Sequence, residues 1–158
     1  MQHSHALHGF TVLVVDDNLS VLEATTYLLE AAFGCQVVTA ASCVEALTLM
    51  EKGTHVDLIF SDVVLTGADG LTLARTARER MPELPVVLTA WEDQIESIIA
   101  CGYMALAKAY SVKELESMFT ELLCKPAAAV SAVPPADDES LSRSFHGSMQ
   151  TGEGTRPV

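Results

Sequence analysis

The sequence predicts an α/β fold built around a parallel sheet of five strands. From residue 10 to residue 125, apolar runs of four to six residues alternate with longer segments in which apolar residues recur at helical spacing. The runs are rich in Val, Ile and Leu, which is typical of parallel strands that are buried on both faces. Strands that alternate with helices in this way favour repeated βαβ units. Hydrophobic residues make up 49% of the chain, which is enough for a packed core.

Each element can be assigned in chain order. Strands are predicted at residues 10–15, 36–40, 56–60, 85–89 and 104–107. Helices are predicted at residues 19–32, 43–52, 70–81, 92–101 and 112–124. Their apolar residues recur every three or four positions, as Leu115, Phe119 and Leu122 do in the last one. We therefore expect each helix to bury one stripe against the sheet.

The ends of several helices carry their own signals. The pairs Ser42 with Glu45 and Ser111 with Glu114 fit the S-x-x-E pattern of a capping box, in which the two residues satisfy each other's backbone N–H groups. Glycines stand where three helices are expected to end, at Gly34, Gly53 and Gly102.

Composition limits the partners that this chain can have. It carries 9 Lys and Arg against 21 Asp and Glu, a net charge of −12, which disfavours nucleic acid and anionic membranes. No apolar stretch approaches the roughly 20 residues of a membrane span, and no signal peptide is evident, so we expect a cytoplasmic protein. The cysteines are widely spaced, and we expect free thiols at Cys35, Cys43, Cys101 and Cys124.

The organisation predicted is one domain at residues 10–125 between two tails. Residues 1–9 contain three histidines that we interpret as solvated rather than metal-binding. Residues 126–158 are rich in Pro, Ala, Ser and Gly and are predicted to be a disordered C-terminal tail. Within it, Leu141, Phe145 and Met149 are four residues apart, and a short partner-docking helix there is a less favoured alternative.

Polar residues gather where the predicted strands end. Asp16 and Asp17 follow the first strand, Asp62 the third, and Lys108 the fifth, while Thr89 ends the fourth. The carboxyl ends of parallel strands form the ligand edge of such a sheet. Taken singly, these residues are typical caps or solvated side chains. Together, crowded carboxylates favour a cation, and oxygen ligands in an open cleft suit Mg²⁺, so the cluster predicts a phosphoryl-transfer site.

Four segments resemble, in their order and spacing, the sequence blocks of the response-regulator receiver domain of two-component signalling. These segments are VLVVDDN, DLIFSDVVLTGADGL, PVVLTA and ALAK. The resemblance covers about residues 10–124. It implies a doubly wound, flavodoxin-like sheet with strand order 2-1-3-4-5 and helices on both faces, a topology that a member of this family exemplifies. A stand-alone, single-domain receiver is the type that we expect.

The resemblance also implies roles for individual residues. Asp62 accepts a phosphoryl group from a histidine kinase or a phosphotransfer protein. The implied ligands of Mg²⁺ are Asp16, Asp17, Asp62 and the backbone carbonyl of Val64, and the groups that receive the phosphoryl oxygens are Thr89 and Lys108. Such a protein is not an enzyme beyond its own phosphoryl transfer and dephosphorylation, and it signals through contact with a further protein.

This chain departs from the family pattern at three positions. Ala109 stands where Pro commonly follows the lysine, so we expect Lys108 to enter the site from a differently shaped loop. Ala105 stands in place of an aromatic switch residue, and Thr66 in place of a Pro, which is expected to loosen the loop after Asp62. A receiver fold that works as an interaction module without phosphorylation is the alternative that these departures favour.

Two other phosphate-handling classes fit less well. A haloacid-dehalogenase-type enzyme needs a second carboxyl group two residues after its nucleophile, where this chain has Val64. A flavodoxin-like mononucleotide binder needs a phosphate loop after the first strand, where Asp16 and Asp17 would repel phosphate.

Overall fold

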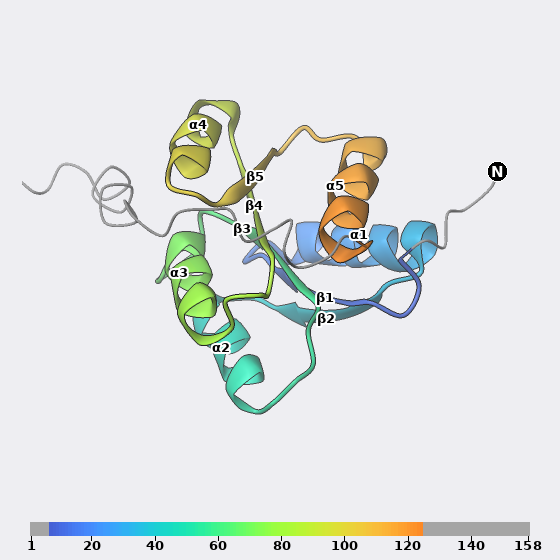
Figure 1. Ribbon diagram of the computed structural model, residues 1–158, viewed down its shortest axis with the longest axis horizontal. Coiled ribbons are helices and arrows are strands. Elements are labelled where there is room, and N and C mark those ends of the chain that lie inside the picture. The colour runs from blue at the N-terminus through green and yellow to red at the C-terminus, as the bar shows by residue number, and fades with distance from the viewer. Residues whose placement is uncertain (1–6, 125–158) are drawn as a thin grey trace, which may run out of the picture.

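Five parallel strands form one sheet in the order β2-β1-β3-β4-β5, as the computed structural model shows for residues 7–124, the part of the chain that the structure describes (Figure 1). The strands are β1 (Thr11–Val15), β2 (Gln36–Ala40), β3 (Leu58–Asp62), β4 (Val86–Ala90) and β5 (Met104–Ala107). Every pair of neighbouring strands runs parallel. The predicted doubly wound fold and its strand order are confirmed.

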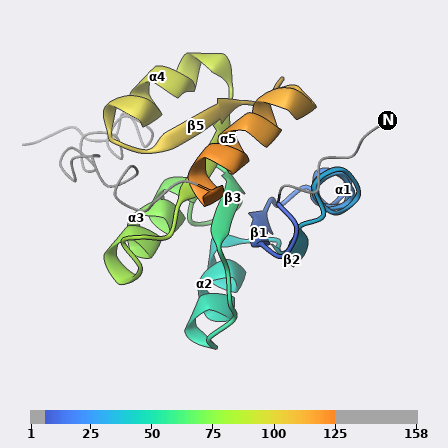
Figure 2. The ribbon, with the colours of Figure 1, turned by 45° about the vertical axis from the view of Figure 1, so that its right-hand side comes forward.

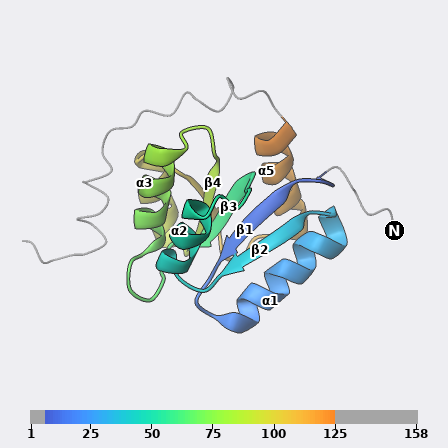
Figure 3. The same ribbon diagram turned by 90° about the horizontal axis from the view of Figure 1, so that it is seen from below.

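Helices cover both faces of this sheet. They are α1 (Leu19–Leu28), α2 (Cys43–Glu51), α3 (Gly70–Arg80), α4 (Glu92–Ala100) and α5 (Val112–Cys124). Figures 1 and 3 show α1 and α5 on one side of the sheet and α2 and α3 on the other, and the packing of α4 places it with α2 and α3.

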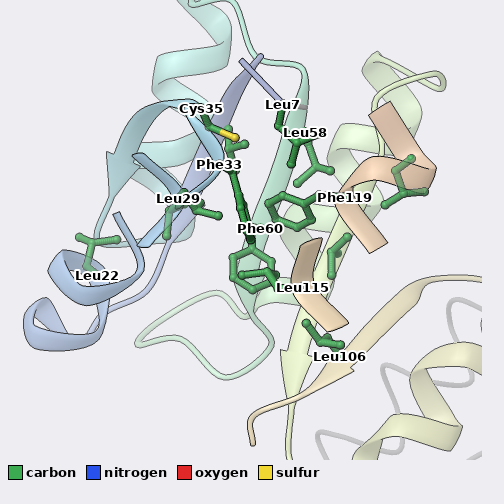
Figure 4. Packing of buried hydrophobic residues seen from close by; sticks show 14 residues of the cluster. Leu7, Leu22, Leu29, Phe33, Cys35, Leu58, Phe60, Leu106, Leu115 and Phe119 are labelled. Carbon is green, nitrogen blue, oxygen red and sulfur yellow. The ribbon is translucent and has the colours of Figure 1, made fainter. Parts of the chain in front are cut away.

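The core under α1 and α5 is built from alternate residues of the strands. Val12 and Val14 of β1 point into it because successive side chains of a strand face opposite ways. Phe60 of β3 and Phe119 of α5 meet edge to face, with ring centroids 5.3 Å apart. Figure 4 shows these two rings beside one another, and Figure 2 shows α5 in front of β3. This contact fixes α5 over the centre of the sheet.

The opposite face buries the intervening residues of the same strands. Leu13 and Ile59 pack with Ala46 of α2 and Leu73 of α3. Ile98 of α4 packs in a neighbouring cluster with residues of α3, β4 and β5. Because both faces are covered, the central strands are buried over their whole length, as their apolar sequences predict.

Apart from shifts of one residue at several ends, the structure differs from the predicted elements at three points. β3 begins and ends two residues later than expected, and its end is extended because Ser61 and Asp62 pair with β4 although both are polar. The first helix changes at Leu29 into a π-helical turn, η1 (Leu29–Phe33), whose first and last residues are both buried. Leu7, which the sequence places in the N-terminal tail, is 1% exposed and belongs to the core.

The predicted helix ends are confirmed. Ser111 Oγ accepts from the N–H of Glu114 at 3.1 Å, and Glu114 Oε2 accepts from the N–H of Ser111 at 2.9 Å. Ser42 caps α2 by accepting from the N–H of Glu45 at 3.0 Å, but Glu45 Oε1 accepts from the N–H of Ala41 rather than from that of Ser42, so the second half of this predicted box differs. The glycines at positions 34, 53 and 102 all have positive φ.

Some predictions lie outside the described residues: the first six residues of the N-terminal tail, and the C-terminal tail with its possible docking helix. The four cysteines lie within residues 7–124 and are free thiols, three of them buried and one exposed. Between residues 7 and 124 no helix is long and apolar enough to cross a membrane.

Candidate functional site

The predicted site residues come together at the carboxyl edge of the sheet. β1 leads into Asp16 and Asp17, and β3 ends on Asp62, whose partner in the neighbouring strand is Thr89. Lys108 directly follows β5. All of these residues, together with Val64, line one pocket of about 440 Å³.

Asp62 lies at the centre of the pocket and is held through both carboxylate oxygens. Its side chain is almost buried, at 8% exposure. Oδ2 pairs with the ammonium of Lys108 at 3.0 Å. Oδ1 accepts from the backbone N–H of Val64 at 3.1 Å. These two contacts fix the plane of the carboxylate without closing the pocket over it.

Lys108 reaches Asp62 although Ala109 follows it. No cis peptide bond occurs between residues 7 and 124, so the bond between these two residues is trans. The backbone N–H of Lys108 donates to the carbonyl of Ala90 at 2.9 Å, which continues the pairing of β5 with β4. Its Nζ also lies 4.9 Å from the ring centroid of Trp91. The loop therefore places the ammonium of Lys108 beside Asp62 although the peptide bond to Ala109 is trans.

Asp16 experiences the crowding of negative charge in the site. Burial raises the pKa of this carboxyl above its usual range, and the charges of Asp62 and Asp17 raise it further. The N–H of Asn18, which donates to Asp16 Oδ1 at 2.9 Å, and the ammonium of Lys108 both act to lower that pKa. Burial is the largest cause of the net upward shift of this pKa, and the neighbouring carboxylates add to it.

Asp17 is exposed and is held from across the pocket by Thr66. Its Oδ2 accepts from the backbone N–H of Thr66 at 2.8 Å and from the hydroxyl of Thr66 at 2.6 Å. The sequence predicts that Thr66, in place of a Pro, loosens the loop after Asp62. The structure contradicts that prediction, since this residue ties the loop to the end of β1.

Tyr110 is a further residue of the pocket, and the sequence alone assigns it no role in the site. It hydrogen-bonds to Thr25 of α1, and its ring meets Phe60 edge to face at 5.9 Å. Burial raises the pKa of its phenol, and the charge of Asp16 adds to that rise. The one sequence signal that could have identified Tyr110 is its place two residues after Lys108. Its contact with Thr25 joins residues that are far apart in the sequence, so it could not be predicted from the sequence.

Gly70 allows α3 to begin directly against the site. Its N–H donates to the carbonyl of Val63 at 2.8 Å. A Cβ atom on Gly70 would lie 2.3 Å from the carbonyl oxygen of Asp62 and 2.9 Å from Cα of Val63. Any larger residue at this position would therefore displace the backbone that carries Asp62.

The donor set suits a hard, partly hydrated cation. Among residues 7–124, no three His, Cys, Asp or Glu side chains converge into a preformed metal cage. Asp17 is turned toward Thr66, and Asp62 toward Lys108. Mg²⁺ usually keeps several waters and takes carboxylate and phosphate oxygens together, so an open cluster of oxygens with excess negative charge fits it better than a closed cage would.

Comparison with known proteins agrees with this geometry. The family model of the response regulator receiver domain matches residues 12–120. The sensor kinase CckA of Brucella abortus (strain 2308) is 34% identical over 122 residues, which cover 73% of this chain and 13% of that kinase. This chain therefore spans a small part of that curated relative.

Solved structures show the same similarity. The receiver domain of the hybrid histidine kinase CckA superposes with a TM-score of 0.59 at 31% identity, covering 72% of this chain and 98% of that one. The response regulator TrrA of Thermotoga maritima, solved in complex with Mg²⁺ and BeF, has a TM-score of 0.66 at 25% identity, covering 72% of this chain and 99% of that one.

Proposed function

Because the chain belongs to the response regulator receiver domain family, whose general function is phosphorylation-switched signalling, we propose that Asp62 is its phosphoryl acceptor. The donor is a histidine kinase or a phosphotransfer protein of a two-component phosphorelay. The similarity to a sensor kinase and to the receiver of a hybrid histidine kinase supports this class of partner.

The observation that carries the proposal is the ion pair between Lys108 and Asp62, at 3.0 Å in a pocket that opens to solvent. A carboxylate buried at the base of a pocket, beside one ammonium and two further carboxylates, is costly for the fold, which makes it a candidate for a functional role. The orientation of both oxygens gives Asp62 the fixed position that in-line attack requires.

The chemistry follows from these groups. One oxygen of Asp62 forms a bond to phosphorus while the P–N bond of the donor phosphohistidine breaks, and the electron pair stays on the imidazole, which gains a proton from solvent. Mg²⁺, when held by Asp16, Asp17, Asp62 and the carbonyl of Val64, would neutralise charge on the phosphoryl oxygens.

Lys108 and Thr89 supply the remaining stabilisation of the negative charge on the phosphoryl group. Phosphorylation replaces the single charge of Asp62 with a group carrying about two negative charges. The ammonium of Lys108 then donates to a phosphoryl oxygen. Thr89 is nearly buried beside Asp62, and within residues 7–124 its hydroxyl makes no hydrogen bond to protein, so it is available to a second oxygen. These new contacts bias the segments that follow β4 and β5, which is how the signal leaves the site.

Labelling with acetyl phosphate tests the proposal. We expect the intact mass of the wild-type chain to increase by one phosphoryl group in the presence of Mg²⁺, and Asp62→Asn to abolish the increase while the fold persists. Asp57→Asn is the matched control, because Asp57 is also a partly buried, hydrogen-bonded aspartate but lies outside the pocket. Labelling that survives in Asp62→Asn would place the acceptor elsewhere.

The alternative function, a receiver-fold interaction module that works without phosphorylation, is favoured by Ala105 and Ala109 alone. An unlabelled wild-type chain, with Mg²⁺ and phosphodonor in excess, would support this alternative. The intact ion pair of Lys108 with Asp62 is the reason for ranking it second.

A further inference from the structure

Thr66 makes an unusual contact with the acidic site. Its backbone N–H and its hydroxyl both donate to the same oxygen, Oδ2 of Asp17, across a sequence separation of 49 residues. Within residues 7–124, Asp17 accepts two hydrogen bonds, and both end on this oxygen. Oδ1 is thereby left for another ligand.

The segment that carries Thr66 has few other attachments near its tip. Leu65 anchors one side of it in the core, and Asp69 anchors the other by capping α3. Thr66, Gly67 and Ala68 are all exposed between these anchors. Gly67 has a φ of +83° and no atom within 4 Å of its Cβ position. The bonds to Asp17 are therefore what holds the tip of this loop against the pocket.

We propose that Thr66 is a positioning residue for Mg²⁺ binding, acting through Asp17. This inference rests on the proposed function, because it concerns the cation site of the same pocket. The two hydrogen bonds fix the rotation of the Asp17 carboxylate so that Oδ1 is presented to the pocket. They also hold Val64, two residues before Thr66, in place, so its carbonyl and Asp17 approach the cation site as one unit.

Physical chemistry gives the sign and the size of the effect. Hydrogen bonds to a carboxylate are charge-assisted and short, as the 2.6 Å bond from the Thr66 hydroxyl is. A ligand that is already oriented loses less freedom when the cation binds. Removing such an outer contact to a metal-ligating carboxylate typically weakens metal affinity by about 10-fold to 100-fold. Because Thr66→Val keeps the backbone N–H, the lower end of that range applies.

Titration of the full chain with MgCl₂ tests the proposal, followed by calorimetry and by the fluorescence of Trp91, which lines the same pocket. We expect Thr66→Val to raise the Kd for Mg²⁺ by about tenfold. Thr66→Ser, which keeps the hydroxyl, should restore the Kd to within about twofold of the wild-type value, an effect that a loss of packing could not produce.

Thr72→Val is the matched control. Its hydroxyl also donates to an aspartate, Asp69, at 3.0 Å, but this bond lies at the N-cap of α3 and does not involve Asp17. We expect this variant to leave the Kd for Mg²⁺ unchanged. A Kd in Thr66→Val within twofold of wild type, or a lower one, would overturn the proposal.

Phosphorylation separates this inference from the function on which it rests. At saturating Mg²⁺, Thr66→Val should take up as much phosphoryl label from acetyl phosphate as the wild type, because the hydroxyl does not touch Asp62. If the wild type binds Mg²⁺ and becomes labelled but the Kd does not depend on Thr66, the positioning role fails alone. If the wild type neither binds Mg²⁺ nor becomes labelled, both proposals fail.

Discussion

Trp91 and Val64 flank the approach to Asp62. Both line the pocket and are exposed, at 60% and 53%. Hydrolysis of an aspartyl phosphate needs a water in line with phosphorus, and neither side chain can orient one. The indole, which lies over Lys108, is large enough to cover the approach. These two residues should therefore slow the loss of the phosphoryl group.

We predict that Val64→Asn combined with Trp91→Ala shortens the phosphoryl half-life about tenfold, equivalent to about 1.4 kcal/mol of barrier. The half-life is measured by intact mass at saturating Mg²⁺. Trp91→Phe is the control, because it keeps an aromatic face over Lys108 while reducing the cover. An unchanged or longer half-life in the double variant would mean that these residues do not govern access of water.

Thiol reactivity gives a second test at the level of single residues. Burial raises the pKa of Cys35 to about 11, and it also raises the pKa of Cys43. Cys124 is exposed. At pH 8 we expect iodoacetamide to alkylate Cys124 quickly and the buried thiols only on unfolding, because the thiolate is the reactive form. Peptide mapping of alkylated protein would identify the labelled positions, and rapid labelling of Cys35 in the native protein would contradict its burial.

The raised pKa of Cys35 also makes the free energy of unfolding depend on pH. In the unfolded chain the thiol of Cys35 ionises near the ordinary cysteine pKa of 9.0, whereas in the folded protein it stays protonated until about 11. Above pH 9 the unfolded state therefore holds fewer protons than the folded state, and the free energy of unfolding falls as pH rises. Cys35→Ala should weaken this dependence between pH 9 and 11 in chemical denaturation.

At the scale of elements, the junction of β3 with α3 tolerates no side chain at Gly70. We predict that Gly70→Ala lowers the free energy of unfolding by about 2 kcal/mol or more, since the atoms it would meet belong to the backbone. Thermal unfolding measures the change, and phosphoryl labelling of Asp62 should fall with it.

Gly53→Ala provides the comparison for Gly70. This glycine has a φ of +83° and no atom within 4 Å of its Cβ position. Its substitution is expected to cost about 1 kcal/mol through the left-handed backbone alone and to leave labelling intact. Equal losses of labelling in the two variants would rule out a specific role for the junction.

The sequence predicted the bounds of two edge strands best. β2 and β5 begin and end at the predicted residues, although each has a single buried residue. The prediction for β3 ends two residues early, since Ser61 and Asp62 are polar yet pair with β4. The π-helical turn after α1 also escaped prediction, because Leu29 and Phe33 keep a four-residue spacing that an α-helix would show as well.

At the scale of the whole molecule, the ends of the parallel strands predict which polar residues come together. Asp16, Asp62 and Thr89 lie together because parallel strands bring their carboxyl ends to one edge. Contacts between distant loops could not be predicted in this way. The bonds from Thr66 to Asp17 depend on the path of the loop after β3, and no period or motif encodes that path.

Charge also acts over the whole molecule. The chain has a net charge of −12, so any salt stabilises it by screening repulsion between its acidic groups. A cation that binds the folded site adds a separate contribution. That contribution is about 1.4 kcal/mol when free Mg²⁺ is ten times its Kd, which corresponds to a rise in Tm of about 4 °C for a domain of this size.

We therefore predict that MgCl₂ raises the Tm more than NaCl does at equal ionic strength. Asp17→Asn alters the net charge by a single unit, so its response to NaCl should match that of the wild type, while most of the additional rise with MgCl₂ is lost. Differential scanning calorimetry of both proteins in both salts makes the comparison. Identical responses of the wild type to the two salts would mean that screening of the acidic chain accounts for the whole effect, and that the carboxylates at the sheet edge bind no cation in this range.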